Sequence, residues 1–225
     1  GYFISAGNDD TQCIQKAFDT SRNGWTATLR FPSASYKITG TVYWDAQQTR
    51  IVGDGCVNNS TIYMDSGIRQ DMLVSYGART FLGHITNPTT GTDPAVISIT
   101  NDFPRIENIA FVYAGHYIGE SVTPNEPLQN SSNSVLTFTA PGETNGIDNI
   151  YIDGGKHAVR ILAPNGPGLR IMNSTLAAQG DAAISVEAPI YPTWNGSAWV
   201  AATGAGIGML TVDNCSSDYR GAYYT

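Results

Sequence analysis

The sequence has 225 residues, 41% of them apolar and 14% charged, which is enough for one sizeable core and predicts a single domain over residues 1–225. A formal net charge of −7 with only 12 basic residues argues against a nucleic-acid partner, because phosphate binding needs a basic surface. No apolar run reaches the ~18 residues that a membrane-spanning helix needs, so we expect no membrane insertion.

The three cysteines, Cys13, Cys56 and Cys215, match neither a disulfide framework nor a zinc site, so no metal or other cofactor is predicted. Free thiols indicate assembly in a reducing cytoplasm. The chain begins at Gly1 instead of Met and stops inside a repeated segment without the cap that a solenoid needs. We therefore expect it to be part of a longer chain.

Residues 1–25 are predicted to form a cap region around one short helix. Residues 9–11, which read Asp-Asp-Thr, supply side chains that can cap its first amides. Ile14, Ala17 and Phe18 then fall on one face of the helix, which suits packing against the end of a β structure.

Alternation of apolar and polar residues predicts short strands along the next part of the chain. The predicted strands are 26–31, 36–39, 41–44, 50–52, 60–64, 72–76, 80–85 and 95–100. Residues 32–35 and 53–55 contain Pro and Gly and are predicted turns.

From residue 106 onwards one pattern recurs: an apolar strand, an asparagine, a second short strand and a turn of small residues. The repeated asparagines are Asn108, Asn149, Asn173 and Asn214, at intervals of 41, 24 and 41 residues. An asparagine at a repeated corner tolerates turn geometry and can hydrogen-bond its stacked neighbours. Such self-similarity indicates a solenoid, and the strand-and-turn content predicts an all-β, parallel β-helix whose coils occupy residues 26–225. The alternative is a β-sandwich, because regularly spaced short strands also suit that fold.

The two intervals of 41 residues carry extra material, predicted as excursions near residues 120–144 and 188–206. The first interval is either one coil plus an excursion or two coils, whereas one coil plus an excursion is favoured for the second. In the second excursion, Asn195-Gly196 between strand-like arms predicts a β-hairpin with a type I′ turn.

The residues before the repeated asparagines are Glu107, Asp148, Met172 and Asp213, and alternation with apolar neighbours places them on the outer face. Glu107 and Asp148 then lie about one coil, roughly 5 Å, apart at the backbone, a range that suits the carboxylate pair of a glycosidase. Glu107, Asp148 and Asp213 are therefore candidate catalytic residues. The alternative is a solvated outer face.

Eight positions after the asparagines lie His116, His157, Asp181 and Ala222. A column that contains His157 and Asp181 suits proton transfer and makes both candidate catalytic residues. Arg160 lies nearby and is a candidate for binding the carboxylate of a uronate sugar. The alternative is a set of turn residues that serve only in hydrogen bonding.

Tyr191, Trp194 and Trp199 in the predicted hairpin are candidate carbohydrate-binding residues, because exposed aromatic rings offer sugars a flat apolar face. Trp194 and Trp199 lie on opposite arms. The alternatives are a cross-strand pair that stabilises the hairpin and packing against another subunit.

A family resemblance lies in residues 9–18, 29–38, 50–55 and 60–62. These hold Thr-x-x-Ile-Gln in the helix, Phe31-Pro32 followed by Tyr36, and a Gly-x-Gly turn, with Ala34 where the family pattern has Gly. The chain resembles the pectate-lyase-like superfamily and is most similar to bacteriophage tailspike and tail-fibre depolymerases. The resemblance implies a single-stranded right-handed parallel β-helix with a short N-terminal capping α-helix and inserted loops and a hairpin.

The same resemblance implies a phage tail protein of the virion, assembled in the host cytoplasm as a homotrimer, that recognises a bacterial surface polysaccharide and is a candidate for cleaving it. Whether a bond is cut stays open, since this fold hosts glycoside hydrolases, polysaccharide lyases and plain binders. The alternatives are a non-enzymatic receptor-binding or structural spike module and a secreted microbial polysaccharide lyase or hydrolase.

Overall fold

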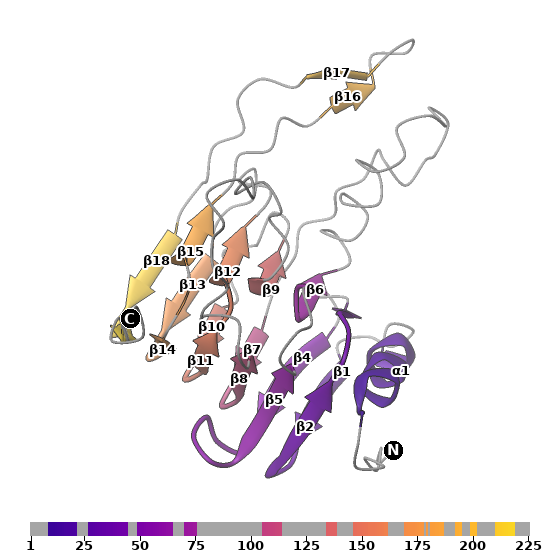
Figure 1. Ribbon diagram of the computed structural model, residues 1–225, viewed down its shortest axis with the longest axis vertical. Helices are drawn as coiled ribbons and strands as arrows, with labels where there is room; N and C mark the ends of the chain where they lie inside the picture. Colours follow the sequence, from indigo (N-terminus) through magenta and orange to yellow (C-terminus); the bar gives the residue numbers. More distant parts are fainter. Residues whose placement is uncertain are drawn as a thin grey trace, which may run out of the picture.

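The computed structural model describes residues 9–21, 27–44, 49–64, 70–75, 105–113, 134–138, 146–161, 169–177, 179, 181–186, 192–194, 199–201 and 210–218. The described residues are mostly β. They form three parallel sheets of six, six and five strands, a two-stranded antiparallel sheet and a single helix (Figure 1).

The strands of each parallel sheet come from places far apart in the sequence. The first sheet contains β1 (Ala27–Phe31), β4 (Thr49–Gly53), β7 (Arg105–Glu107), β10 (Gly146–Asp148), β13 (Leu169–Met172) and β18 (Leu210–Asp213). The second contains β2 (Ala34–Ile38), β5 (Ser60–Met64), β8 (Ala110–Tyr113), β11 (Tyr151–Gly154), β14 (Thr175–Ala177) and β19 (Ser216–Asp218). The third contains β3 (Val42–Trp44), β6 (Leu73–Ser75), β9 (Ser134–Phe138), β12 (His157–Ile161) and β15 (Ala182–Val186).

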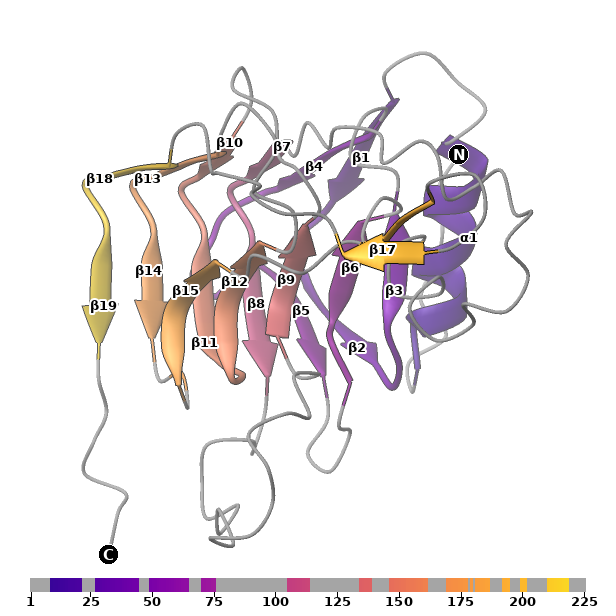
Figure 2. The ribbon, with the colours of Figure 1, turned by 90° about the horizontal axis from the view of Figure 1, so that it is seen from above.

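Successive strands of the chain therefore join the first, second and third sheets in turn. We call three such successive strands, one in each sheet, a layer. The layers follow one another from β1 to β19 across the molecule (Figure 2). Asn108 and Asn149 directly follow neighbouring strands of the first sheet, as do Asn173 and Asn214. Each 41-residue interval thus advances the chain by one layer. This agrees with the prediction for the second interval and decides between the two alternatives for the first.

The prediction of a single-stranded right-handed parallel β-helix over residues 26–225 is corrected to this arrangement of three parallel sheets. The antiparallel pair β16 (Pro192–Trp194) and β17 (Trp199–Ala201) forms a sheet of its own. The sequence could not predict how the strands connect, because alternation of apolar residues predicts only which side of a strand is buried. Alternation carries no information on whether successive strands close into one continuous coil, or on the hand of such a coil.

Individual strands agree with the sequence to different degrees. The prediction for β5 is confirmed at both ends, and the predicted hairpin arms are confirmed as β16 and β17. Strand β2 begins at Ala34, inside a predicted turn. The predicted strands 80–85 and 95–100 and the turn at Asn195-Gly196 lie outside the described residues.

The core is built from apolar side chains that stack in register from layer to layer. In the first sheet the inward column is Leu29, Ile51, Ile106, Ile147, Ile171 and Val212. The four central isoleucines of this column are fully buried. Burial of one such side chain stabilises the fold by about 1.5–3 kcal/mol, so the column is a major source of stability.

The repeated asparagines turn the chain from the first sheet into the second. All four have the left-handed backbone conformation, with φ between 48° and 56°. Side-chain amides connect the layers at this corner: Asn149 Nδ2 donates to Asn108 Oδ1 at 2.7 Å, and Asn214 Nδ2 donates to Asn173 Oδ1 at 2.7 Å. The predicted asparagine stacking is confirmed. We call these side chains the asparagine ladder.

Gly53 occupies the corner directly beneath Asn108. A Cβ atom on Gly53 would collide with the backbone carbonyl oxygen of Asn108. The two layers can therefore approach to normal strand spacing only because position 53 has no side chain.

Helix α1 (Thr11–Ser21) packs against β1 and β3 at one end of the three sheets (Figure 2). Gln15 replaces a neighbouring strand, because its side chain donates to the Tyr43 carbonyl at 2.9 Å and accepts from the Tyr43 amide at 2.8 Å. Phe18 packs on Trp44 with ring centroids 6.0 Å apart. The helix thus satisfies and covers an otherwise open sheet edge. No helix among the described residues is long and apolar enough to cross a membrane.

Asp9 fixes the start of this helix. Its carboxylate accepts hydrogen bonds from the Thr11 amide at 3.0 Å, from the Thr11 hydroxyl, and from the Thr39 hydroxyl at 2.6 Å. The hydrogen bonds from Thr11, and secondarily from Thr39, hold the pKa of Asp9 below its ordinary value of 3.8. The ionised carboxylate therefore joins the start of the helix to Thr39, the residue directly after β2.

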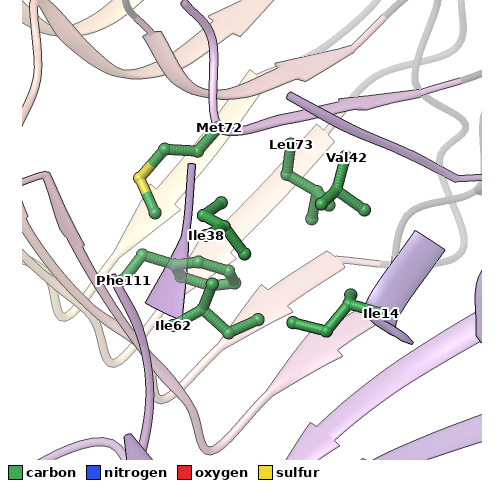
Figure 3. A pocket seen from close by; sticks show the side chains of 7 residues that line it. All are labelled: Ile14, Ile38, Val42, Ile62, Met72, Leu73 and Phe111. Atoms are coloured by element: carbon green, nitrogen blue, oxygen red, sulfur yellow. The ribbon is translucent and has the colours of Figure 1, made fainter. Parts of the chain in front are cut away.

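A small apolar cavity of about 10 Å³ lies between the helix and the first layers. Its lining consists entirely of apolar side chains, which point toward one another in Figure 3: Ile14, Ile38, Val42, Ile62, Met72, Leu73 and Phe111. This space is about that of one water molecule and offers no polar group to orient a ligand. We interpret it as a packing gap in the core.

We expect Asn149→Ala to lower the free energy of unfolding by about 2 kcal/mol, because it removes a hydrogen bond and places alanine in the left-handed conformation. Asn58→Ala is the matched control. Asn58 has φ 57° but makes no side-chain hydrogen bond within the described part of the chain. Urea unfolding followed by circular dichroism should give about half the loss for the control. Equal losses would show that the ladder bond contributes nothing.

Acid should weaken helix docking through Asp9. Because the folded-state pKa of Asp9 is lowered, its contribution is present above pH ~3.8 and is lost as the pH falls through the folded value. Asp9→Ala should cost about 1 kcal/mol near neutral pH, and this difference from the wild type should shrink toward pH 2. Thermal unfolding from pH 2 to 7 measures it; a difference that stays constant with pH would contradict the assignment.

Candidate functional site

The acidic column predicted from the sequence is present on the outer face of the first sheet. Glu107 pairs in register with Asp148, Asp148 with Met172, and Met172 with Asp213. Glu107 and Asp148 therefore occupy adjacent strands, about 4.8 Å apart at the backbone. Both are half-buried, whereas Asp213 is exposed.

Two of these carboxylates already have strong partners. The Arg50 guanidinium and the Glu107 carboxylate form a bidentate ion pair. Arg50 Nε donates to Glu107 Oε1 at 3.1 Å, and Arg50 Nη2 donates to Glu107 Oε2. Asp148 Oδ1 accepts a hydrogen bond from Asn173 Nδ2 at 2.8 Å and so joins the asparagine ladder. These contacts favour structural roles for Glu107 and Asp148, and their catalytic role stays a prediction.

Sequence reasoning missed a second outer column, which lies three positions before the repeated asparagines. It consists of Thr28, Arg50, Arg105, Gly146, Arg170 and Thr211. The signal was present in the sequence, because Arg precedes two of the four apolar residues that lie two positions before the repeated asparagines, namely Ile106 and Ile171. The outer face of the first sheet therefore carries basic and acidic columns side by side.

The third sheet carries a different polar arrangement, centred on His157. His157 is 3% exposed. Its Nε2 lies 3.1 Å from Asp181 Oδ2, and its Nδ1 lies 3.1 Å from Ser134 Oγ. The structure thus brings together His157 and Asp181, which the repeat spacing had placed in one column, and adds Ser134, which sequence reasoning missed.

The exposure of Ser134, His157 and Asp181 decides which of them a substrate can reach. The Asp181 side chain is 56% exposed and also lies 3.9 Å from Lys156 Nζ, whereas Ser134 is fully buried. A substrate can therefore reach Asp181 but not Ser134, so Ser134 is excluded as a nucleophile. The reachable chemistry is proton transfer at the Asp181 carboxylate, with His157 behind it.

Arg160 lies in a buried cluster beside this pair. Its Nη1 lies 3.8 Å from Asp71 Oδ2, and both residues are buried. Asp71 also accepts from the Ser134 amide at 2.7 Å and from the Thr137 hydroxyl at 2.8 Å. Burial of Arg160 favours a structural role, and its predicted contact with a uronate stays a prediction. Asp71 and Thr137 have no repeat signature in the sequence.

The predicted aromatic site is described only through its backbone. Trp194 and Trp199 are register partners in the antiparallel pair β16–β17, as their places on opposite arms indicated. Tyr191, His116 and Ala222 lie outside the described residues. Within the described residues, no group of three His, Cys, Asp or Glu side chains is placed to hold a metal ion.

No family model matches the chain, and no curated protein matches it. The chain is similar to the crystal structure of the pre-mature gene product 12 of bacteriophage phi29, with a TM-score of 0.54 and 13% sequence identity. The similarity covers 81% of this chain and 22% of that one, so the chain spans about a fifth of the length of the structure that it matches. At this identity the likeness shows a shared fold.

We expect Asp71→Ala to lower the free energy of unfolding by about 3 kcal/mol or more, because it deprives buried Arg160 of an ionic partner. Asp71→Ala combined with Arg160→Met should cost less than the sum of the two single substitutions, since no charge is then left buried. Urea unfolding of the four proteins measures the coupling. Strictly additive losses would show that the two side chains do not interact.

Proposed function

We propose that the chain is part of a bacteriophage tailspike or tail fibre, related to the pectate-lyase-like proteins, that recognises a bacterial surface polysaccharide. The observation that carries the proposal is the shared fold with a phage gene product over 81% of the chain. The sequence motifs of residues 9–18 and 29–38 support it, because they resemble those of tailspikes. The protein would then act in the virion and, by the same resemblance, as a homotrimer.

The outer faces of the sheets suit an elongated ligand. Parallel strands repeat at about 4.8 Å, so outward side chains form straight rows of polar groups along the stack. A polysaccharide also repeats at short, regular intervals. A ligand that lies along the stack can make the same kind of contact at several layers, which raises affinity through many individually weak interactions.

Cleavage of the polysaccharide is a second candidate function, favoured by the His157–Asp181 pair. The exposed Asp181 carboxylate is placed to accept a proton from a substrate, and buried His157 is placed to hold that carboxylate and share the proton. This constellation fits general base catalysis in a lyase or a hydrolase. The acidic column is the weaker candidate, because Arg50 already occupies Glu107.

Recognition is tested by affinity electrophoresis of the protein in gels that contain purified bacterial surface polysaccharides. We expect at least one of them to retard the protein. Sedimentation velocity tests the trimer. The proposal fails if the folded protein is retarded by no polysaccharide in a broad panel and is a monomer.

For cleavage, we expect release of reducing ends or of unsaturated uronates from the polysaccharide that binds. Asp181→Asn should then lower the rate by about 100-fold or more while binding persists, as expected for loss of a general base. Asp19→Asn, on the exposed face of α1, is the matched control for loss of one carboxylate. If Glu107→Gln with Asp148→Asn stops turnover and Asp181→Asn does not, the acidic column is the catalytic site.

A further inference from the structure

Two arginines on the outer face of the first sheet are exposed and have no partner among the described residues. Arg105 and Arg170 make no hydrogen bond or ion pair within the part of the chain that the structure describes. They belong to one column, separated by Gly146 on the strand between them. Both guanidinium groups are therefore available to a ligand on this face.

Arg50 shows what an arginine in this column can reach. It binds the carboxylate of Glu107, which lies on the next strand of the stack, two residues beyond Arg105, the register partner of Arg50. The positions related in the same way to Arg105 and Arg170 are Asp148 and Asp213. Aspartate is one methylene shorter than glutamate, and no ion pair joins these residues in the described structure.

The spacing of the two open arginines limits the ligand. They lie two strands apart, roughly 10 Å at the backbone. Gly146 leaves the intervening strand without a basic side chain, and the outward residue that this strand does present is Asp148. One strand spacing is close to the length of one sugar in a polysaccharide. The two open arginines are thus spaced to contact every second sugar of a ligand that lies along the stack.

We propose that Arg105 and Arg170 bind acidic groups on alternate sugars of a polysaccharide laid across β7, β10 and β13. Guanidinium groups hold carboxylates by paired, charge-assisted hydrogen bonds. The sugar between them lies over Gly146 beside Asp148, which accepts its hydroxyl groups and repels a second carboxylate. The inference rests on the proposed function and names the substrate class: an acidic polysaccharide charged at every second residue.

The test uses three polymers as probes: hyaluronan, with a carboxylate on alternate sugars, polygalacturonate, with one on every sugar, and dextran, with none. We expect wild-type protein to bind hyaluronan most tightly in titration calorimetry. Arg105→Gln with Arg170→Gln should weaken that binding by about 100-fold, a factor of about 10 for each charged hydrogen-bonding group. Arg30→Gln is the matched control, because Arg30 is exposed on the same sheet and already pairs with Asp54.

The outcomes separate this inference from the proposed function. Equal affinity of wild type and double variant for hyaluronan, or wild-type affinity for dextran or polygalacturonate equal to that for hyaluronan, overturns the inference alone. Retardation by no polysaccharide at all overturns the proposed function as well. Circular dichroism and thermal unfolding confirm that the double variant is folded, which we expect because both side chains are exposed.

Discussion

The structure depends on a single backbone constraint, the left-handed conformation at each repeated asparagine. This conformation turns the chain sharply between the first and second sheets, and the side chains of Asn149 and Asn214 donate to the asparagine of the preceding layer. Asparagine is suited to both tasks, because it tolerates positive φ and carries a donor and an acceptor on one short side chain. Once the corners are aligned, the register of every strand on either side follows.

The same strand register also aligns the side chains on the outer surface of the first sheet. The register that stacks isoleucines on the inside of the first sheet also stacks Arg50 on Arg105 and Glu107 on Asp148 on the outside. Like charges on neighbouring strands are unfavourable by themselves. The bidentate pair between Arg50 and Glu107 relieves this repulsion at one point, whereas Arg105 and Arg170 keep their charges open to solvent and ligands.

Much of the local structure could be predicted from sequence, because it depends on short-range signals. The asparagine corners, β5 and the helix cap at Asp9 each follow from a few neighbouring residues. The closure of the fold could not be predicted, since alternation does not say how strands in different layers connect. The ion pair between Glu107 and Arg50 could not be predicted either. Arg50 is 57 residues away, and only the register of β4 with β7 brings the two together.

The spacing of the layers in sequence has a practical consequence. Asn173 follows Asn149 after 24 residues and Asn214 follows Asn173 after 41, yet β10, β13 and β18 stack in the same register. Connection length is therefore nearly irrelevant to stacking, as expected when each doubling of a loop costs only about 0.6 kcal/mol in closure entropy. The connection that contains β16 and β17 is thus a natural position for grafting foreign peptides, and a lineage could exchange such segments between relatives without rebuilding the scaffold.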